Sequence, residues 1–369
     1  MSVTSESVLK SLSSIIHPEL GKDIVSLGLV QGLQIADNSV SFTLALLKRN
    51  DPFASSVRRA CEKVLVQELG EGIKVSIGIK AASATPKESP YRTKASVSRV
   101  KNIVAVASGK GGVGKSTVAV NLAVALARKG LAVGLLDADI FGPSGPKMLG
   151  LEGCKPTMMK EDDLELIQPV EGFGVKHLSV GFFVEANSAL IWRGPMASNA
   201  LKQLIHQGAW GELDFLLVDT PPGTSDIHLS LVQELALTGA IIVSTPQDVA
   251  IADAVKGISM FSSVGINVPI LGLVENMAWF TPVELPNNRY YLFGREGCKR
   301  LAERMHIPLL GQIPLVQSIR EGGDDGVPAA AGDGVLSLAF EELAANVSKA
   351  VEQRNLEKPP TQRVEVSPR

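Results

Sequence analysis

A short segment rich in glycine and lysine has the residue types needed to hold phosphate groups. Residues 109–117 read GKGGVGKST and fit the pattern G-x-x-x-x-G-K-[ST]. The glycines let backbone N–H groups approach phosphate oxygens, and the helix expected to follow adds the partial positive charge of its N-terminus. The sequence therefore predicts a nucleotide-binding loop made of Gly109, Lys110, Gly111, Gly112, Val113, Gly114, Lys115, Ser116 and Thr117.

Several polar side chains are expected to act on the phosphates. Lys115 would reach the β- and γ-phosphates, and the Ser116 hydroxyl would bind Mg²⁺. Asp137 and Asp139 follow the apolar segment AVGLL, and Asp219 follows FLLV. Because parallel sheets bind ligands at the carboxyl ends of their strands, these aspartates should lie near the loop.

Each aspartate has an expected role in nucleotide hydrolysis. We predict that Asp219 holds Mg²⁺ through a water and that Asp137 supports the metal shell. Asp139 would orient or activate the water that attacks the γ-phosphate. For a single aspartate at a strand end, a helix N-cap is the alternative role.

The elements that position these residues form an α/β unit over residues 102–350. Apolar runs predict strands at 103–107, 132–136, 214–218, 239–244, 269–274 and 308–312, with helices at 115–129, 196–207, 249–263 and 296–305 between them. This alternation predicts a mostly parallel, doubly wound sheet covered on both faces.

The segments outside this unit have different compositions. Residues 1–80 predict a small α+β domain, with helices at 4–17 and 52–69 and strands at 24–35, 39–47 and 73–79. Residues 81–101 are basic and rich in Ser, Thr and Ala, which predicts a flexible linker. Residues 351–369 are charged and contain prolines, so we expect a disordered tail.

The composition excludes several classes of protein. The formal net charge is −2 and aromatic residues make up 5%, which argues against a nucleic-acid partner. No segment reaches the ~18 apolar residues of a membrane span. The cysteines, Cys61, Cys154 and Cys298, are isolated, which is typical of a reducing compartment. We therefore expect a cytoplasmic protein with no membrane partner.

Taken together, these motifs resemble those of the Mrp/ApbC iron–sulfur cluster carriers, within the MinD/ParA/NifH class of dimeric P-loop ATPases. The matching segments are DADIFGPSGPKMLG at 137–150, WRGPM at 192–196, DTPPGTSDIHLSL at 219–231 and VENMAWF at 274–280. The segment HPELGKDIVSLGLV at 17–30 is similar to the small MIP18/DUF59-type domain that precedes the ATPase in many of these carriers.

The resemblance implies a P-loop NTPase fold, a homodimer, and slow, switch-like ATP hydrolysis with Mg²⁺. It also implies that Lys110 reaches the nucleotide of the partner subunit and acts in catalysis with Lys115 and Asp139. Asn276 matches the position that recognises adenine, and Pro314, in QIP at 312–314, matches the loop on the other side of the base. Apo iron–sulfur proteins are the implied partners.

One part of the family pattern is missing. Typical members carry a C-x-x-C shortly after the ENM segment, and two protomers together hold one [4Fe–4S] cluster. Here residues 281–284 read TPVE, so those ligands are absent and a bound cluster is in doubt. Cys298 is the nearest thiol and could supply one ligand from each subunit, although a lone cysteine is more often a small core residue.

Three functions remain open on the sequence. The leading hypothesis is an ATP-hydrolysing carrier that transfers iron–sulfur clusters to apoproteins. The second is a positioning ATPase of the MinD/ParA kind, which predicts an amphipathic membrane helix or a basic DNA-binding face. The third is a nucleotide-switched scaffold that carries no cluster.

Overall fold

The apolar run before the glycine-rich loop forms strand β4 (Val100–Ala107), which is buried on both faces of a sheet. Ile103, Ala105 and Ala107 pack into one hydrophobic core. Val104 and Val106, which alternate with them, pack into a second core on the opposite face. Successive side chains of a strand point to opposite faces, so a run without polar residues is what a strand between two cores requires.

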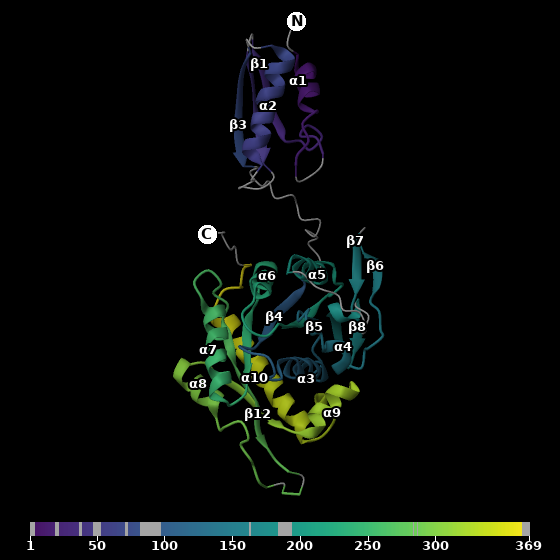
Figure 1. Cartoon of the computed structure of the whole chain (residues 1–369). Helices are drawn as coiled ribbons and strands as arrows, with labels where there is room; N and C mark the ends of the chain where they lie inside the picture. Colours follow the sequence, from purple (N-terminus) through teal and green to yellow (C-terminus); the bar gives the residue numbers. More distant parts are fainter. Residues whose placement is uncertain are drawn as a thin grey trace. The chain divides into compact units, whose positions relative to one another are not determined.

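The computed structural model describes residues 4–18, 22–36, 39–46, 53–70, 73–81, 97–161, 164–183, 194–282, 284–285 and 287–363. The chain divides into two units, Met1–Pro90 and Tyr91–Arg369 (Figure 1). Residues 82–96, most of the predicted linker, lie outside the described part, as do residues 192–193 of the WRGPM segment.

Within the described residues of the larger unit, the main sheet has eight strands in the order β13-β12-β11-β4-β10-β5-β9-β8. Its pairings are parallel except that of β8 with β9. A separate hairpin joins β6 and β7. The strands besides β4 are β5 (Val133–Asp137), β6 (Thr157–Glu161), β7 (Leu164–Gln168), β8 (Val170–Gly172), β9 (Val175–Ser179), β10 (Leu213–Asp219), β11 (Gly239–Ser244), β12 (Ile270–Phe280) and β13 (Leu309–Leu315).

Helices cover both faces of this sheet (Figure 1). On one face lie α3 (Lys115–Arg128) and α10 (Val335–Glu357). The other face is covered by α5 (Gly194–Gln207), α6 (Asp226–Glu234), α7 (Asp248–Ser262) and α8 (Gly297–Met305). Two short helices, α4 (Gly145–Met148) after β5 and α9 (Gln317–Asp325) after β13, pack against each other. This is the predicted doubly wound α/β arrangement.

The strand order brings the chemically important strand ends together. Strand β10 lies between β4 and β5, so Asp219 is in register with both Val106 and Asp137. The glycine-rich loop leaves β4 at this same edge. The sheet therefore places both aspartates beside the loop, although they are far apart in the sequence.

The smaller unit is an α+β domain with its own core. Strand β1 (Val30–Ala36) pairs antiparallel with β2 (Ser39–Leu46), which pairs parallel with β3 (Lys74–Ala81). Helices α1 (Ser5–Leu12) and α2 (Ala54–Leu69) pack on these strands around residues such as Leu12, Phe42 and Leu65. The first helix is shorter than predicted, and residues 24–28 form turns rather than the start of β1.

The predicted tail from residue 351 differs from the structure and needs correction. Helix α10 continues to Glu357, because its apolar periodicity extends past residue 350: Val351 is buried one turn after Val347. Beyond the helix, Arg354 Nη2 donates to Pro359 O over 2.7 Å, and Thr361 Oγ1 donates to Ala236 O over 3.3 Å. The segment is thus packed on the domain as far as Thr361; residues 364–369 lie outside the described part.

A conservative change in this helix tests the correction. Val351→Ala should lower the free energy of unfolding by about 2 kcal/mol, because it leaves a cavity in a closed core. The matched change Glu352→Ala, on the exposed side of the same turn, should alter it by less than about 0.5 kcal/mol. Urea titration followed by tryptophan fluorescence measures both, since all tryptophans lie in the larger unit. Equal stability of the two variants would support the predicted disordered tail from residue 351.

Candidate nucleotide-binding site

The glycine-rich loop adopts a conformation that only its glycines allow. Gly112 and Gly114 have φ angles of +81° and +79°, in the left-handed region, and Gly114 is the N-cap of α3. A Cβ on Gly109 would lie 2.0 Å from the carbonyl oxygen of Asp253 in α7. The loop is therefore wedged between α7 and the start of α3, with its backbone N–H groups near the helix N-terminus.

Two adjoining cavities lie along this loop. One, the phosphate cavity, has a volume of about 220 Å³ and is lined by residues 110–117, Asp139 and Pro222. The other, the base cavity, measures about 270 Å³ and is lined by Asn276, Met277 and Pro314. Gly114, Thr117, Ser144 and Met148 line both. The pair has the division of a nucleotide site, a polar cradle beside a more apolar pocket.

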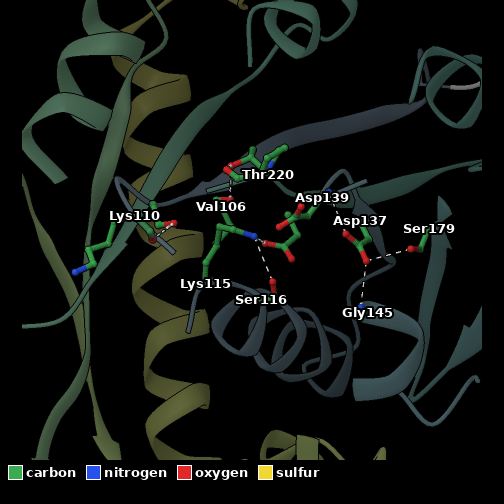
Figure 2. A network of polar contacts seen from close by, with 12 residues as sticks. Val106, Lys110, Lys115, Ser116, Asp137, Asp139, Gly145, Ser179 and Thr220 are labelled. Atoms are coloured by element: carbon green, nitrogen blue, oxygen red, sulfur yellow. Dashed lines mark hydrogen bonds and ion pairs between the residues drawn. The ribbon is translucent and has the colours of Figure 1, made fainter. Parts of the chain in front are cut away.

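Lys115 is the buried cation of the phosphate cavity. Its Nζ donates to Asp219 Oδ1 over 2.5 Å and to Ser116 Oγ over 3.2 Å (Figure 2). The Lys115 and Asp219 side chains are 6% and 3% exposed, so this ion pair lies out of water. The Thr220 N–H also donates to Val106 O, which ties the end of β10 to β4 beneath the loop.

Asp137 organises the loop that follows β5. Its Oδ2 accepts hydrogen bonds from Gly145 N over 3.1 Å and Ser179 Oγ over 3.0 Å (Figure 2). Its Oδ1 accepts from Asp139 N over 3.1 Å. Burial, helped by the charge of Asp219, raises the pKa of Asp137 to about 7. The carboxyl therefore spans the loop from residue 139 to 145 and fixes both its ends.

Asp139 is placed differently from Asp137. It is half-buried and lines the phosphate cavity, and burial raises the pKa of its carboxyl. The nearby Lys115 charge opposes that rise. Of the aspartates after β5, Asp139 is the one whose side chain borders the space expected for the γ-phosphate.

The base cavity holds the predicted Asn276 and Pro314. Asn276 is buried, and its Nδ2 donates to Val113 O over 2.9 Å, which links β12 directly to the glycine-rich loop. The sequence did not point to Met277, whose φ is +56°, or to Arg320 of α9, yet both line this cavity. Nor did it point to Ser179; its position at the end of β9, beside the end of β5, is the signal that could have revealed it.

Lys110 is partly exposed at the mouth of the phosphate cavity. Figure 2 shows its side chain directed away from Lys115 and the aspartates. Among the described residues it forms no ion pair. This placement leaves its ammonium free for a group outside the subunit.

The structure argues against Cys298 as a cluster ligand. Its side chain is fully buried, and its backbone N–H donates to Glu275 Oε2 over 2.7 Å. Burial, reinforced by Glu275, raises the pKa of the thiol well above its usual range, so the thiolate that binds iron is disfavoured. Cys298 is a core residue of α8, as its isolation in the sequence also allowed.

The remaining cysteines differ in accessibility. Burial raises the pKa of Cys61, in the smaller unit, to about 12, whereas Cys154 is exposed. Within the ranges that the structure describes, no cluster of three or more His, Cys, Asp or Glu side chains could hold a metal ion. No helix in the described part of the chain is long and apolar enough to cross a membrane.

The contact between Gly114 and Asn276 gives a prediction. A Cβ at Gly114 would lie 2.2 Å from Asn276 Nδ2, whereas one at Gly112 would meet nothing within 4 Å. Both substitutions strain a left-handed backbone by a similar amount, about 1–2 kcal/mol. Gly114→Ala should therefore weaken nucleotide binding by at least about tenfold more than Gly112→Ala, as equilibrium titration with a fluorescent nucleotide would measure. Equal affinities would show that the Asn276 contact is unimportant.

Each of the two units matches a known protein family. The family described as "ParA: NUBPL iron-transfer P-loop NTPase" matches residues 99–348. The family described as "Iron-sulfur cluster assembly protein" matches residues 5–77, in the smaller unit.

Known proteins with similar sequences match between about two thirds and nearly all of the chain. An iron-sulfur cluster carrier protein of Synechocystis sp. is 44% identical over 354 residues, which cover 94% of this chain and 99% of the relative. A mitochondrial iron-sulfur protein of Arabidopsis thaliana, required for NADH dehydrogenase, is 52% identical and covers 69% of this chain and 80% of its own. A nucleotide-binding protein from Archaeoglobus fulgidus, solved with ADP, is 38% identical, with a TM-score of 0.54, and the match covers 62% of this chain and 88% of that one.

Proposed function

Since the chain belongs to the NUBPL iron-transfer P-loop NTPase family, we propose that it is an ATP-hydrolysing factor that carries iron–sulfur clusters to apoproteins. The observation that carries the proposal is the phosphate cavity, where Lys115, Ser116 and Asp219 meet beside a separate base cavity. The cluster is the cargo of this protein, and the nucleotide controls its delivery.

The residues present fit a divalent cation beside the nucleotide. The Lys115 ammonium lies between Ser116 Oγ and Asp219 Oδ1, so two hard oxygen donors already surround one positive charge. Hydroxyl and carboxylate oxygens are ligands that Mg²⁺ accepts, with phosphate oxygens and waters completing its shell. Bound there, Mg²⁺ would neutralise charge on the β- and γ-phosphates. Lys115 would then exchange its contact with Asp219 for the phosphates.

The base cavity favours adenine over guanine. Asn276 Nδ2 is committed to Val113 O, which leaves its Oδ1 as an acceptor with no protein partner in the described part of the chain. Adenine presents an amino group at the six position, which can donate to that oxygen, whereas guanine presents an acceptor there. Two facing acceptors cost free energy in a buried site.

Asp139 is the residue we assign to the attacking water. It borders the phosphate cavity, and its backbone N–H is held by Asp137, so its position depends on the loop from residue 139 to 145. A carboxylate at this point orients water and accepts its proton as the γ-phosphoryl group is transferred. The same loop would sense whether the γ-phosphate is present.

A second copy of the chain completes the site. Lys110 lies at the cavity mouth and is directed away from its own aspartates (Figure 2). In a homodimer with the two loops facing, this ammonium would stabilise negative charge on the nucleotide of the partner subunit. Nucleotide state would thereby set how the subunits pack.

Cluster binding must rely on thiols other than Cys298. Cys154 is exposed, so we propose that it contributes a thiolate, one from each subunit, with thiols of the client, or of the thiol reductant in the reconstitution mixture, supplying the remaining ligands. The test is anaerobic reconstitution with iron and sulfide, followed through the charge-transfer absorption near about 400 nm. We expect the absorption in the unmodified protein and in Cys298→Ser, and its loss in Cys154→Ser.

A nucleotide-switched scaffold is the second candidate. The burial of Cys298, together with TPVE in place of the usual cysteine pair, is the observation that favours it. In that case the unmodified protein would show no absorption after reconstitution, yet would bind an apo client in a nucleotide-dependent manner.

A further inference from the structure

A third cavity lies at the end of the main sheet opposite the nucleotide site. We call it the basal cavity; its volume is about 580 Å³. It is lined by the first residues of β4, Val100, Lys101 and Ile103, and by the segment that follows α10. The glycine-rich loop leaves the other end of β4, so at about 3.3 Å per residue the two sites are roughly 25 Å apart.

The charges around the basal cavity have one sign. Among the residues that the structure describes, four basic side chains line it, Lys101, Arg354, Lys358 and Arg363, together with His206, and no aspartate or glutamate does. Lys101 is paired with Asp214 over 2.8 Å, and His206 with Glu234 over 2.7 Å. Among the described residues, Arg354, Lys358 and Arg363 form no ion pair. Within the described part of the chain, the cavity therefore has three cationic groups without a counter-charge.

Arg354 is the most unusual of these groups. It is 8% exposed, and its hydrogen bonds go only to neutral oxygens: Asn355 Oδ1 over 2.9 Å and Pro359 O over 2.7 Å. Its Nε is buried and has no partner in the structure. A buried guanidinium normally has a carboxylate beside it. Without one, the free energy lost when the charge leaves water is not offset by attraction to an opposite charge. Consistent with this, burial lowers the pKa of Arg354.

Hydrogen bonds hold the wall of the cavity in place. Asn355 Nδ2 donates to Asn102 Oδ1 over 2.9 Å, which joins the end of α10 to the start of β4. The contacts of Pro359 and Thr361 described above hold the following segment in place. Val97, Val100 and Pro360 give the lining an apolar part beside the charges.

We propose that the basal cavity binds a small organic anion, whose phosphate or carboxylate group contacts Arg354, Lys358 and Arg363 and whose apolar part lies against Val97, Val100 and Pro360. Its volume lies within the range of small-molecule sites, about 300–1,000 Å³. In the sequence on either side of this lining, residues 82–96 carry Lys87, Arg92 and Lys94 against Glu88, and residues 364–369 carry Arg369 against Glu365. The site is separate from the one that binds nucleotide and does not depend on the proposed function.

Direct titration tests the proposal. Phenyl phosphate and benzoate are titrated by calorimetry into the full-length protein saturated with Mg-ADP, so that the phosphate cavity is blocked. We expect one of them to bind, and the responding probe identifies the anionic group as phosphate or carboxylate. Lys358→Ala/Arg363→Ala, which changes two exposed side chains, should raise the Kd about tenfold or more, because two charge-assisted contacts are lost.

A matched variant separates the site from a general charge effect. Lys129→Ala/Lys349→Ala removes the same charge at exposed positions outside the cavity and should leave the Kd unchanged within about twofold. Arg354→Gln should raise the Kd for the probe by a similar factor to Lys358→Ala/Arg363→Ala. Its tryptophan fluorescence must show that the domain is folded. Failure of both probes to bind the unmodified protein would overturn the proposal, and so would equal effects of the two double variants.

Discussion

Lys115→Ala is expected to raise the Kd for ATP by at least about 100-fold. The ammonium is the one buried cation of the phosphate cavity in the described structure, and charge-assisted contacts to phosphate contribute about 1.5–3 kcal/mol each. The substitution also leaves the Asp219 carboxylate buried beside Asp137 without a counter-ion, so stability should fall by about 3 kcal/mol. Equilibrium titration with a fluorescent ATP analogue and urea titration measure the two effects.

Lys110→Ala is the matched control for this variant. It removes a lysine from the same loop, but one that is partly exposed and without an ion pair in the described structure. ATP affinity should change by less than about threefold and stability by less than about 0.5 kcal/mol, while hydrolysis falls because the charge offered to the partner is lost. If Lys115→Ala bound ATP as well as Lys110→Ala, the role given to Lys115 would be wrong.

Asp139→Ala should separate binding from hydrolysis. The side chain borders the phosphate cavity, whereas the contacts to Gly145 and Ser179 at the far end of the loop are made by Asp137. We expect kcat to fall by about 10²–10⁴-fold, the usual contribution of a positioned general base, with a Kd for ATP unchanged within about threefold. Phosphate release under saturating ATP, together with nucleotide titration, measures both quantities.

Asp139→Asn is the companion variant. It keeps the shape of the side chain but cannot accept a proton, so its kcat should fall nearly as far as that of the alanine variant. Normal turnover in either variant would refute the assignment. A loss of ATP binding in both would mean that Asp139 holds the loop rather than the water.

The nucleotide site could be predicted from the sequence because its signals are local. Backbone conformation fixes the spacing of glycines between a buried strand and a helix, and the structure has the expected strand β4 and helix α3 on either side. The aspartates follow continuous apolar runs, and these runs are typical of strands buried on both faces. Six strands of the main sheet were predicted for the same reason, five of them within about three residues at each end, whereas β12 continues six residues beyond its predicted end.

Features that depend on tertiary contacts could not be predicted. The pairing of Lys115 with Asp219 requires β10 to lie beside β4, and no local pattern shows the strand order. The hydrogen bond from Ser179 to Asp137 likewise requires β9 to lie next to β5. The support that Asp137 is expected to give to the metal shell stays a prediction. The end of α10 was predicted to be part of a disordered tail, because residues 351–369 are charged and contain prolines. The burial of Val351 and Arg354 depends on packing against the rest of the domain, which composition does not show.

A crystal structure of the protein with Mg²⁺ and a non-hydrolysable ATP analogue tests the account most directly. We expect the triphosphate against the backbone N–H groups of residues 110–116, Lys115 turned from Asp219 to the phosphates, and the base beside Asn276. Lys110 of a second copy should approach the same phosphates. An analogue bound elsewhere, with Lys115 still paired to Asp219, would contradict it.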